Sequence, residues 1–189
     1  RYVVNPLPAM YSTSSSGSPS RPDYFTIMGY LQIDGDNLLI GVPKTDGYAT
    51  DYGMAFIYDL TDGSIKHTIE PPFASSANRI TLQFGGVVSI DADNVYIGSY
   101  DRVNSSGNPS STGTGDHSLY HYDLSNLPTA TVSGKPGLVA AGQTYVEHIF
   151  VERQYLDDHA EYRVFGYGGE LIVGADNEDD TDGSGGTTS

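Results

Sequence analysis

The chain has 189 residues and carries 9 Lys and Arg against 24 Asp and Glu, for a formal net charge of −15 at pH 7. Nucleic acid and anionic membrane surfaces repel such a chain, and no apolar run reaches the ~20 residues of a membrane-spanning helix, so we expect neither nucleic-acid binding nor membrane insertion. The absence of cysteine excludes disulfides, thiolate catalysis and Cys-ligated metal sites.

The composition favours a β-rich chain with many turns, because 23 Gly and 10 Pro punctuate a sequence that contains 15 Tyr. Residues 1–24 are predicted to form an N-terminal extended segment. Within it, Tyr2-Val3-Val4 is short and apolar enough to be a strand donated to a neighbouring sheet.

A repeated unit begins after this segment, and its first copy is predicted to span residues 25–72. The sequence Ile-Asp-Gly-Asp-Asn-Leu-Leu-Ile-Gly at 33–41 recurs as Ile-Asp-Ala-Asp-Asn-Val-Tyr-Ile-Gly at 90–98. The second half recurs as well, since Met-Ala-Phe-Ile-Tyr-Asp-Leu at 54–60 matches Ser-Leu-Tyr-His-Tyr-Asp-Leu at 118–124. Repeats of this length indicate supersecondary units that stack. The strands expected in the first copy lie at 25–33, 38–41, 54–59 and 65–69.

The second copy is predicted to span residues 73–133, and a connection at 134–160 separates it from the first half of a third copy at 161–189. A polar loop at 99–117, rich in Ser, Gly and Asn, divides the second copy. Its expected strands lie at 80–90, with an interruption at Gly85-Gly86, and at 95–98, 118–123 and 129–132. The third copy is expected to contain strands at 161–165 and 171–174.

Apolar triplets such as Leu38-Leu39-Ile40 do not alternate with polar residues, so both faces of these strands should be covered. Four-stranded antiparallel sheets packed face to face are the blades of a β-propeller, and the predicted fold class is therefore all-β with propeller blades. Two and a half units cannot close a ring. The propeller is thus expected to be partial, either as a piece of a longer polypeptide or as one of several protein chains that complete one another.

The residues Phe84-Gly85-Gly86, followed by 89–98, resemble an FG-GAP repeat, the blade unit of integrin-α-like β-propellers. Phe165-Gly166 and Val173-Gly174-Ala175-Asp176 are similar to the same pattern in compressed form. The resemblance implies a propeller fold and leaves the function open, because propellers serve binding, scaffolding and catalysis. The segments 58–63 and 174–183 also resemble repeat-rich structural proteins of marine tailed bacteriophages.

The candidate metal site is the acidic loop that follows residue 175. Oxygen ligands at alternate positions before a glycine suit a hard cation such as Ca²⁺. The candidate Ca²⁺ ligands are Asp176, Glu178, Asp180 and Asp182. The alternative is a solvated acidic loop, because charge runs usually are one. The shorter pairs Asp34/Asp36 and Asp91/Asp93 are predicted to form turns.

The histidines give no catalytic constellation, and no catalytic residue is assigned. His117 and His121 are expected on one strand, where four residues span ~13 Å, too far for a shared metal. Glu147-His148 and Asp157-Asp158-His159 could combine as an acid and a base, but no nucleophile motif lies near them.

The expected function is that of a non-enzymatic structural or adhesion module, extracellular or on a virion surface. Its long loops, 42–53, 99–117 and 175–188, are expected to project from one rim, where a surface glycan or receptor would bind. The alternative is a carbohydrate-binding or carbohydrate-cleaving propeller that uses rim carboxylates and Tyr side chains. Tyr96, Tyr100, Tyr120 and Tyr122 are expected mainly to pack inside the sheets.

Overall fold

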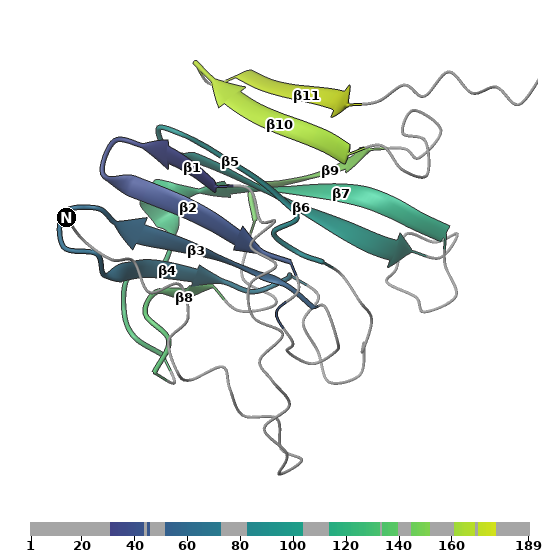
Figure 1. Ribbon diagram of the computed structural model, residues 1–189. Helices are drawn as coiled ribbons and strands as arrows, with labels where there is room; N and C mark the ends of the chain where they lie inside the picture. The colour runs from purple at the N-terminus through teal and green to yellow at the C-terminus, as the bar shows by residue number, and fades with distance from the viewer. Residues whose placement is uncertain are drawn as a thin grey trace, which may run out of the picture.

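The computed structural model describes residues 31–43, 45, 52–72, 83–103, 114–132, 134–139, 145–151, 161–168 and 170–176. Within these residues the chain is all-β apart from one short 3-10 turn, η2 (Leu124–Asn126). This confirms the predicted all-β class. The strands form a five-stranded sheet, a four-stranded sheet and a two-stranded hairpin (Figure 1).

The five-stranded sheet contains the four strands of the first repeat unit. Two of its strands have the predicted bounds, and β2 is longer than expected by one residue at each end. The strands are β1 (Leu31–Asp34), β2 (Asn37–Val42), β3 (Met54–Asp59), β4 (Ile65–Ile69) and β8 (Leu138–Val139), which pair in that order. Only β8 runs parallel to its neighbour, with Thr68 opposite Leu138.

The four-stranded sheet belongs to the second unit, and its central strands continue into the segment 99–117 that was expected to be a loop. The strands are β5 (Val87–Asp91), β6 (Asn94–Val103), β7 (Thr114–Asp123) and β9 (Glu147–Val151), which pair in that order. The β6–β7 ladder runs as far as Val103 opposite Thr114. A strand ladder is held by backbone hydrogen bonds, so the polar composition of this segment did not prevent its pairing.

The prediction of a fourth strand at 129–132 is wrong, because β9 takes that place from within the predicted connection. The chain turns away from the sheet at η2, and Val132, which is 49% exposed, forms only an isolated bridge to Lys135. The apolar segment 147–151 pairs with β7 instead, with Ile149 opposite Leu119. The segment 134–160 therefore supplies one strand to each of the two larger sheets, β8 to the first and β9 to the second.

The third unit is a hairpin of β10 (Glu161–Tyr167) and β11 (Glu170–Asp176), as expected. It lies beside β5, and the backbone N–H of Gly166 donates to Ser89 Oγ over 2.8 Å. A Cβ added at Gly166 would lie 2.9 Å from Asp91 Cβ, so the two strands approach more closely than a larger residue allows. The first strands of the three units thus follow one another in space (Figure 1).

The main core lies between the two larger sheets. Leu39, with no exposed surface, faces the second sheet, whereas Leu38 and Ile40 on the opposite face of β2 are each 8% exposed. Both faces of this strand are therefore covered, as its unbroken apolar triplet predicts. The core between the sheets consists of Leu39, Ala55, Ile57, Ile69, Phe84, Val88, Ile90, Val95, Ile97, Tyr120, Tyr122, Leu127 and Val139.

The segment Phe84-Gly85 locks the two sheets together. Phe84 is fully buried and packs against Tyr120 with ring centroids 5.9 Å apart. Its backbone N–H donates to Tyr52 O over 3.2 Å, and the Gly85 N–H donates to Gly98 O over 2.8 Å. The Phe-Gly pair therefore joins the two units, since the Phe84 side chain fills the core and the backbone bonds both to Tyr52, which precedes β3, and to Gly98 in β6.

Replacement of Thr68 on β4 is expected to stabilise the protein. Its side chain is 1% exposed, and Oγ1 has no hydrogen-bond partner among the described residues. Because an unpaired buried hydroxyl costs free energy, Thr68→Val should raise the free energy of unfolding by about 1 kcal/mol, measured by urea denaturation. The matched control is Thr61→Val, which should lower it, because Thr61 Oγ1 donates to Asp59 Oδ1 over 2.5 Å. Equal effects of the two substitutions would contradict this assignment.

Candidate functional surface at the tight-turn end

The hairpin turns of the three units and the far ends of their second strands lie at opposite ends of the sheets (Figure 1). At one end, here called the tight-turn end, lie the hairpin turns closed by Asp34 opposite Asn37, Asp91 opposite Asn94 and Tyr167 opposite Glu170. At the other, here called the long-loop end, β2, β6 and β11 finish. Most of the residues at 42–53, 99–117 and 175–188 that were predicted to form loops on one rim lie outside the described ranges. The carboxylates of the described residues that gather at the tight-turn end are Asp34, Asp36, Asp59, Asp62, Asp91, Asp93, Asp123, Glu147 and Glu170.

A Tyr-Asp-Leu turn at this end is built in the same way in both units. Asp59 Oδ1 accepts the backbone N–H of Thr61 over 2.8 Å, and Asp123 Oδ1 accepts that of Ser125 over 2.9 Å. The hydroxyls of these two residues donate to the same oxygens.

Each Tyr-Asp-Leu turn is tied to the hairpin of its own unit. The N–H of Leu60 donates to Asp36 O over 2.8 Å, and the N–H of Leu124 donates to Asp93 O over 2.7 Å. The recurrence seen in the sequence at 54–60 and 118–124 therefore preserves a turn that closes one end of each sheet.

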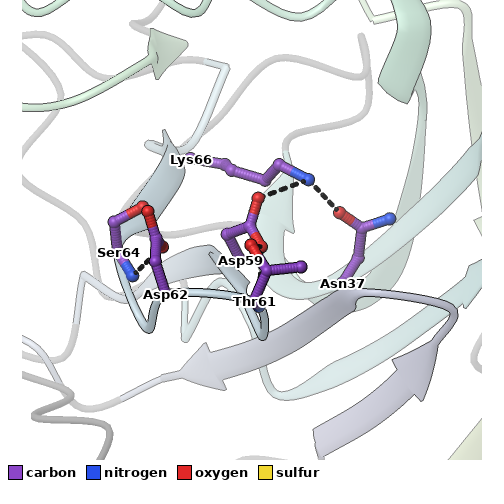
Figure 2. A network of polar contacts seen from close by, with 6 residues as sticks. All are labelled: Asn37, Asp59, Thr61, Asp62, Ser64 and Lys66. Atoms are coloured by element: carbon purple, nitrogen blue, oxygen red, sulfur yellow. Dashed lines mark hydrogen bonds and ion pairs between the residues drawn. The ribbon is translucent and has the colours of Figure 1, made fainter.

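In the first unit a lysine completes this network (Figure 2). Lys66 Nζ lies 3.2 Å from Asp59 Oδ2 and donates to Asn37 Oδ1 over 3.0 Å. The hydrogen bonds from Thr61, together with Lys66, lower the pKa of Asp59 to about 2. Because the folded pKa lies below the unfolded value, this stabilisation is present above about pH 4 and is lost as the pH falls towards 2. The pKa of Asp123 is lowered too, chiefly by the Ser125 hydroxyl.

The pairs Asp34/Asp36 and Asp91/Asp93 flank turns, as predicted, and they also connect units. Gly35 and Ala92 occupy the same turn position with φ of 54° and 50°. The backbone N–H of Ala92 donates to Asp34 Oδ2 over 2.7 Å, which joins the second hairpin to the first. No sequence pattern indicates this contact, because the residues of one turn do not show which other turn lies next to it.

A polar cluster on the second sheet contains one of the predicted acid–base candidates. His121 Nε2 lies 2.9 Å from Asn94 Oδ1, and the imidazole stacks on Tyr96 with centroids 4.7 Å apart. Glu147 pairs in register with His121 through β9. Burial, and then the charges of Asp91 and Glu147, raise the pKa of Tyr96. The cluster depends on the long-range β7–β9 pairing, which local sequence patterns do not reveal.

His67 is the most deeply buried histidine among those whose side chains are described. It is 4% exposed, and its Nδ1 lies 2.7 Å from Pro128 O, so the neutral ring with a proton on Nδ1 donates to that carbonyl. Burial lowers its pKa from the ordinary value of 6.5.

This burial predicts a loss of stability in weak acid. The unfolded chain binds a proton at His67 more readily than the folded chain, so the free energy of unfolding should fall as the pH drops below about 6.5. Urea denaturation between pH 8 and 5.5 should show this slope in the wild type and a smaller slope in His67→Asn, which retains a donor for Pro128 O. Identical slopes would contradict the assignment.

The predicted calcium ligands fall mostly beyond the described residues. Asp176 ends β11, whereas Glu178, Asp180 and Asp182 lie outside the described ranges, as do Asp157, Asp158 and His159. His117 and His121 share the strand β7, as expected, and His148 lies in β9. In the part of the chain that the structure describes, no three His, Asp or Glu side chains are placed to hold a metal ion.

The calcium hypothesis for the acidic loop has a direct test. If Ca²⁺ binds the folded loop, removal by EDTA should lower Tm, and excess Ca²⁺ should restore it. Differential scanning fluorimetry of wild type and Asp180→Asn gives the comparison, because the variant should lose the response. An unchanged Tm in the wild type would favour the solvated loop.

Comparisons with family models, curated proteins and solved structures gave no match. Among the described residues no helix has the length and apolar character needed to cross a membrane.

Proposed function

We propose that the chain is a run of consecutive β-propeller blades of the FG-GAP type, which serves as a non-enzymatic structural and adhesion module on a cell exterior or a virion surface. The blades are unit 1 (β1–β4), unit 2 (β5, β6, β7 and β9) and the hairpin of unit 3 (β10 and β11). Two sheets of the same strand order, packed face to face, support this assignment.

The observation that carries the proposal is one unit-to-unit hydrogen bond that occurs twice. Gln32 Oε1 of unit 1 accepts the backbone N–H of Ile90 in unit 2 over 3.1 Å. Ser89 Oγ of unit 2 accepts that of Gly166 in unit 3 over 2.8 Å. The two acceptors are equivalent, because Gln32 and Ser89 each lie two residues before the last paired residue of the first strand in their hairpin. The two donors are equivalent as well, because Ile90 and Gly166 each lie one residue before that position in theirs. The contact that joins unit 1 to unit 2 is thus repeated between unit 2 and unit 3, as expected of consecutive propeller blades.

The polar side chains of the tight-turn end support a structural role. Asp59 and Asp123 hold their turns, Asp34 joins two hairpins, and His67 bonds to a backbone carbonyl. These four side chains could serve as acids or bases, and each of them is a partner in the fold. A net charge of −15 suits a salt-rich exterior, where counter-ions screen the repulsion.

A binding and turnover experiment tests this function. Beads carrying the full chain are applied to a glycan array and to intact cells, and the soluble chain is incubated with a polysaccharide panel. We expect the beads to be retained and no product to be released. Beads carrying Gly41→Val, which should not fold, are the control for non-specific retention. Release of a product that one carboxylate substitution abolishes would overturn the proposal and establish a carbohydrate-cleaving propeller.

A further inference from the structure

We propose that two copies of this chain associate head to tail, with the first strand of unit 1 in one copy docking on the hairpin of unit 3 in the other. The inference rests on the unit stacking of the proposed function. It concerns two surfaces. The rear margin is Leu31 and Ile33 on β1, and the forward margin is Ile172 on β11.

The rear margin is exposed in unit 1 and buried at the same positions in unit 2. Leu31 and Ile33 are 59% and 56% exposed, whereas their equivalents Val88 and Ile90 are 4% and 1% exposed. The equivalence follows from the hairpin registers, in which Ile33 and Ile90 both precede the closing residue. In unit 2 this margin is covered by β1 and β2 of unit 1. The rear margin of unit 1 therefore has the chemistry of a unit-to-unit interface, and it is exposed.

The forward margin shows the complementary difference. Ile172 is 56% exposed, whereas its equivalent in unit 1, Leu39, has no exposed surface and packs against unit 2. Both residues lie two positions after the hairpin closes. The two exposed margins are therefore the two halves of the interface that units 1 and 2 make with each other.

A second copy supplies the matching half for both margins. In the hairpin register, Phe165 of unit 3 holds the position of Gln32 and Ser89. An interface between unlike surfaces closes when the rotation between copies permits it. Two copies contribute six units in whole or in part, which is within the ~4–8 blades of closed propellers.

Analytical ultracentrifugation of the full chain tests the association. The wild type should sediment as a dimer that dissociates on dilution, and Ile33→Glu and Ile172→Glu should each weaken its Kd by at least about tenfold. Val132→Glu is the matched control, because Val132 is an exposed apolar residue away from both margins, and it should leave the dimer unchanged.

A mixing experiment separates head-to-tail docking from back-to-back docking. An equimolar mixture of Ile33→Glu and Ile172→Glu should form a heterodimer, because one rear margin and one forward margin remain intact. Back-to-back docking would leave Ile172→Glu dimeric by itself, and that result would overturn the proposal. A wild type that stays monomeric up to about 100 μM would overturn it as well.

Amide hydrogen exchange distinguishes a failure of the proposed association from a failure of the proposed function. The stacking of units within one chain predicts slow exchange at the amides of Ile90 and Gly166, and faster exchange at Gly166 in Ser89→Ala. If the chain is monomeric and these amides are protected, only the proposed association of two copies is wrong. If the chain is monomeric and both amides exchange rapidly, the proposed stacking of units is wrong as well.

Discussion

Replacing Gly41 by alanine is expected to lower the free energy of unfolding by at least about 3 kcal/mol, enough to unfold much of a chain of ordinary stability. Gly41 lies near the end of β2, where the Phe84-Gly85 segment packs against it. A Cβ added at Gly41 would overlap the carbonyl oxygen of Gly85 and lie 2.9 Å from Val88 Cγ1. Most of the overlap is with backbone, so no side-chain rotation relieves it and the two sheets must separate.

The matched control is Gly35→Ala in the first hairpin turn. A Cβ there meets nothing within 4 Å, although φ is 54°. Unit 2 carries Ala92 at the same turn position with a φ of 50°, so the loss should be only about 1 kcal/mol. Urea denaturation of both variants, followed by circular dichroism, gives the comparison. If Gly41→Ala cost no more than Gly35→Ala, the close approach of the two sheets at this point would be wrong.

Truncating Phe84 to alanine is expected to cost about 3–5 kcal/mol, the usual range for a fully buried phenylalanine. The ring has no exposed surface and packs on Tyr120 between the two sheets. Its loss leaves a cavity that the backbone bonds to Tyr52 and Gly98 prevent from closing. Both sheets border this cavity, so both should lose protection from hydrogen exchange together.

Two further variants provide the comparison for the cost of Phe84→Ala. Phe84→Leu refills most of the volume and should cost clearly less than Phe84→Ala. Val132→Ala truncates an exposed side chain and should change the free energy of unfolding by less than about 0.5 kcal/mol. A cost of Phe84→Ala close to that of Val132→Ala would place Phe84 outside the core.

Strand positions could be predicted where turn residues punctuate the chain. Asp-Gly-Asp-Asn and Asp-Ala-Asp-Asn mark the hairpins, and the Tyr-Asp-Leu-Thr-Asp-Gly sequence at 58–63 separates β3 from β4, so these two strands have their predicted bounds. The strand residues at 99–103 and 114–117 were not expected because their polar composition is typical of loops, yet the pairing of β6 with β7 needs only backbone hydrogen bonds. Strand β9 was missed because its place is decided by β7, which lies far from it in the sequence.

The contacts at the candidate surface were less predictable than the strands. The sequence indicated turn-forming aspartates, and the structure has them in turns. It did not indicate that Asp34 bonds to the turn of the next unit, or that His121 stacks on Tyr96. Both contacts depend on the register between strands and the step between units, and a local pattern of residues encodes neither. The buried environment of His67 has the same origin, because Pro128 reaches it from the second unit.

The parallel strand β8 has a consequence for the order of events during synthesis. Leu138 and Val139 pair with the outer edge of the first sheet, and Lys135 forms an ion pair with Glu70 beside them. The ribosome must therefore finish β5, β6 and β7 of the second unit before this edge of β4 receives its partner. Until then the nascent chain presents an open edge that other polypeptides can join, so chaperones that cover extended segments should matter most in that interval.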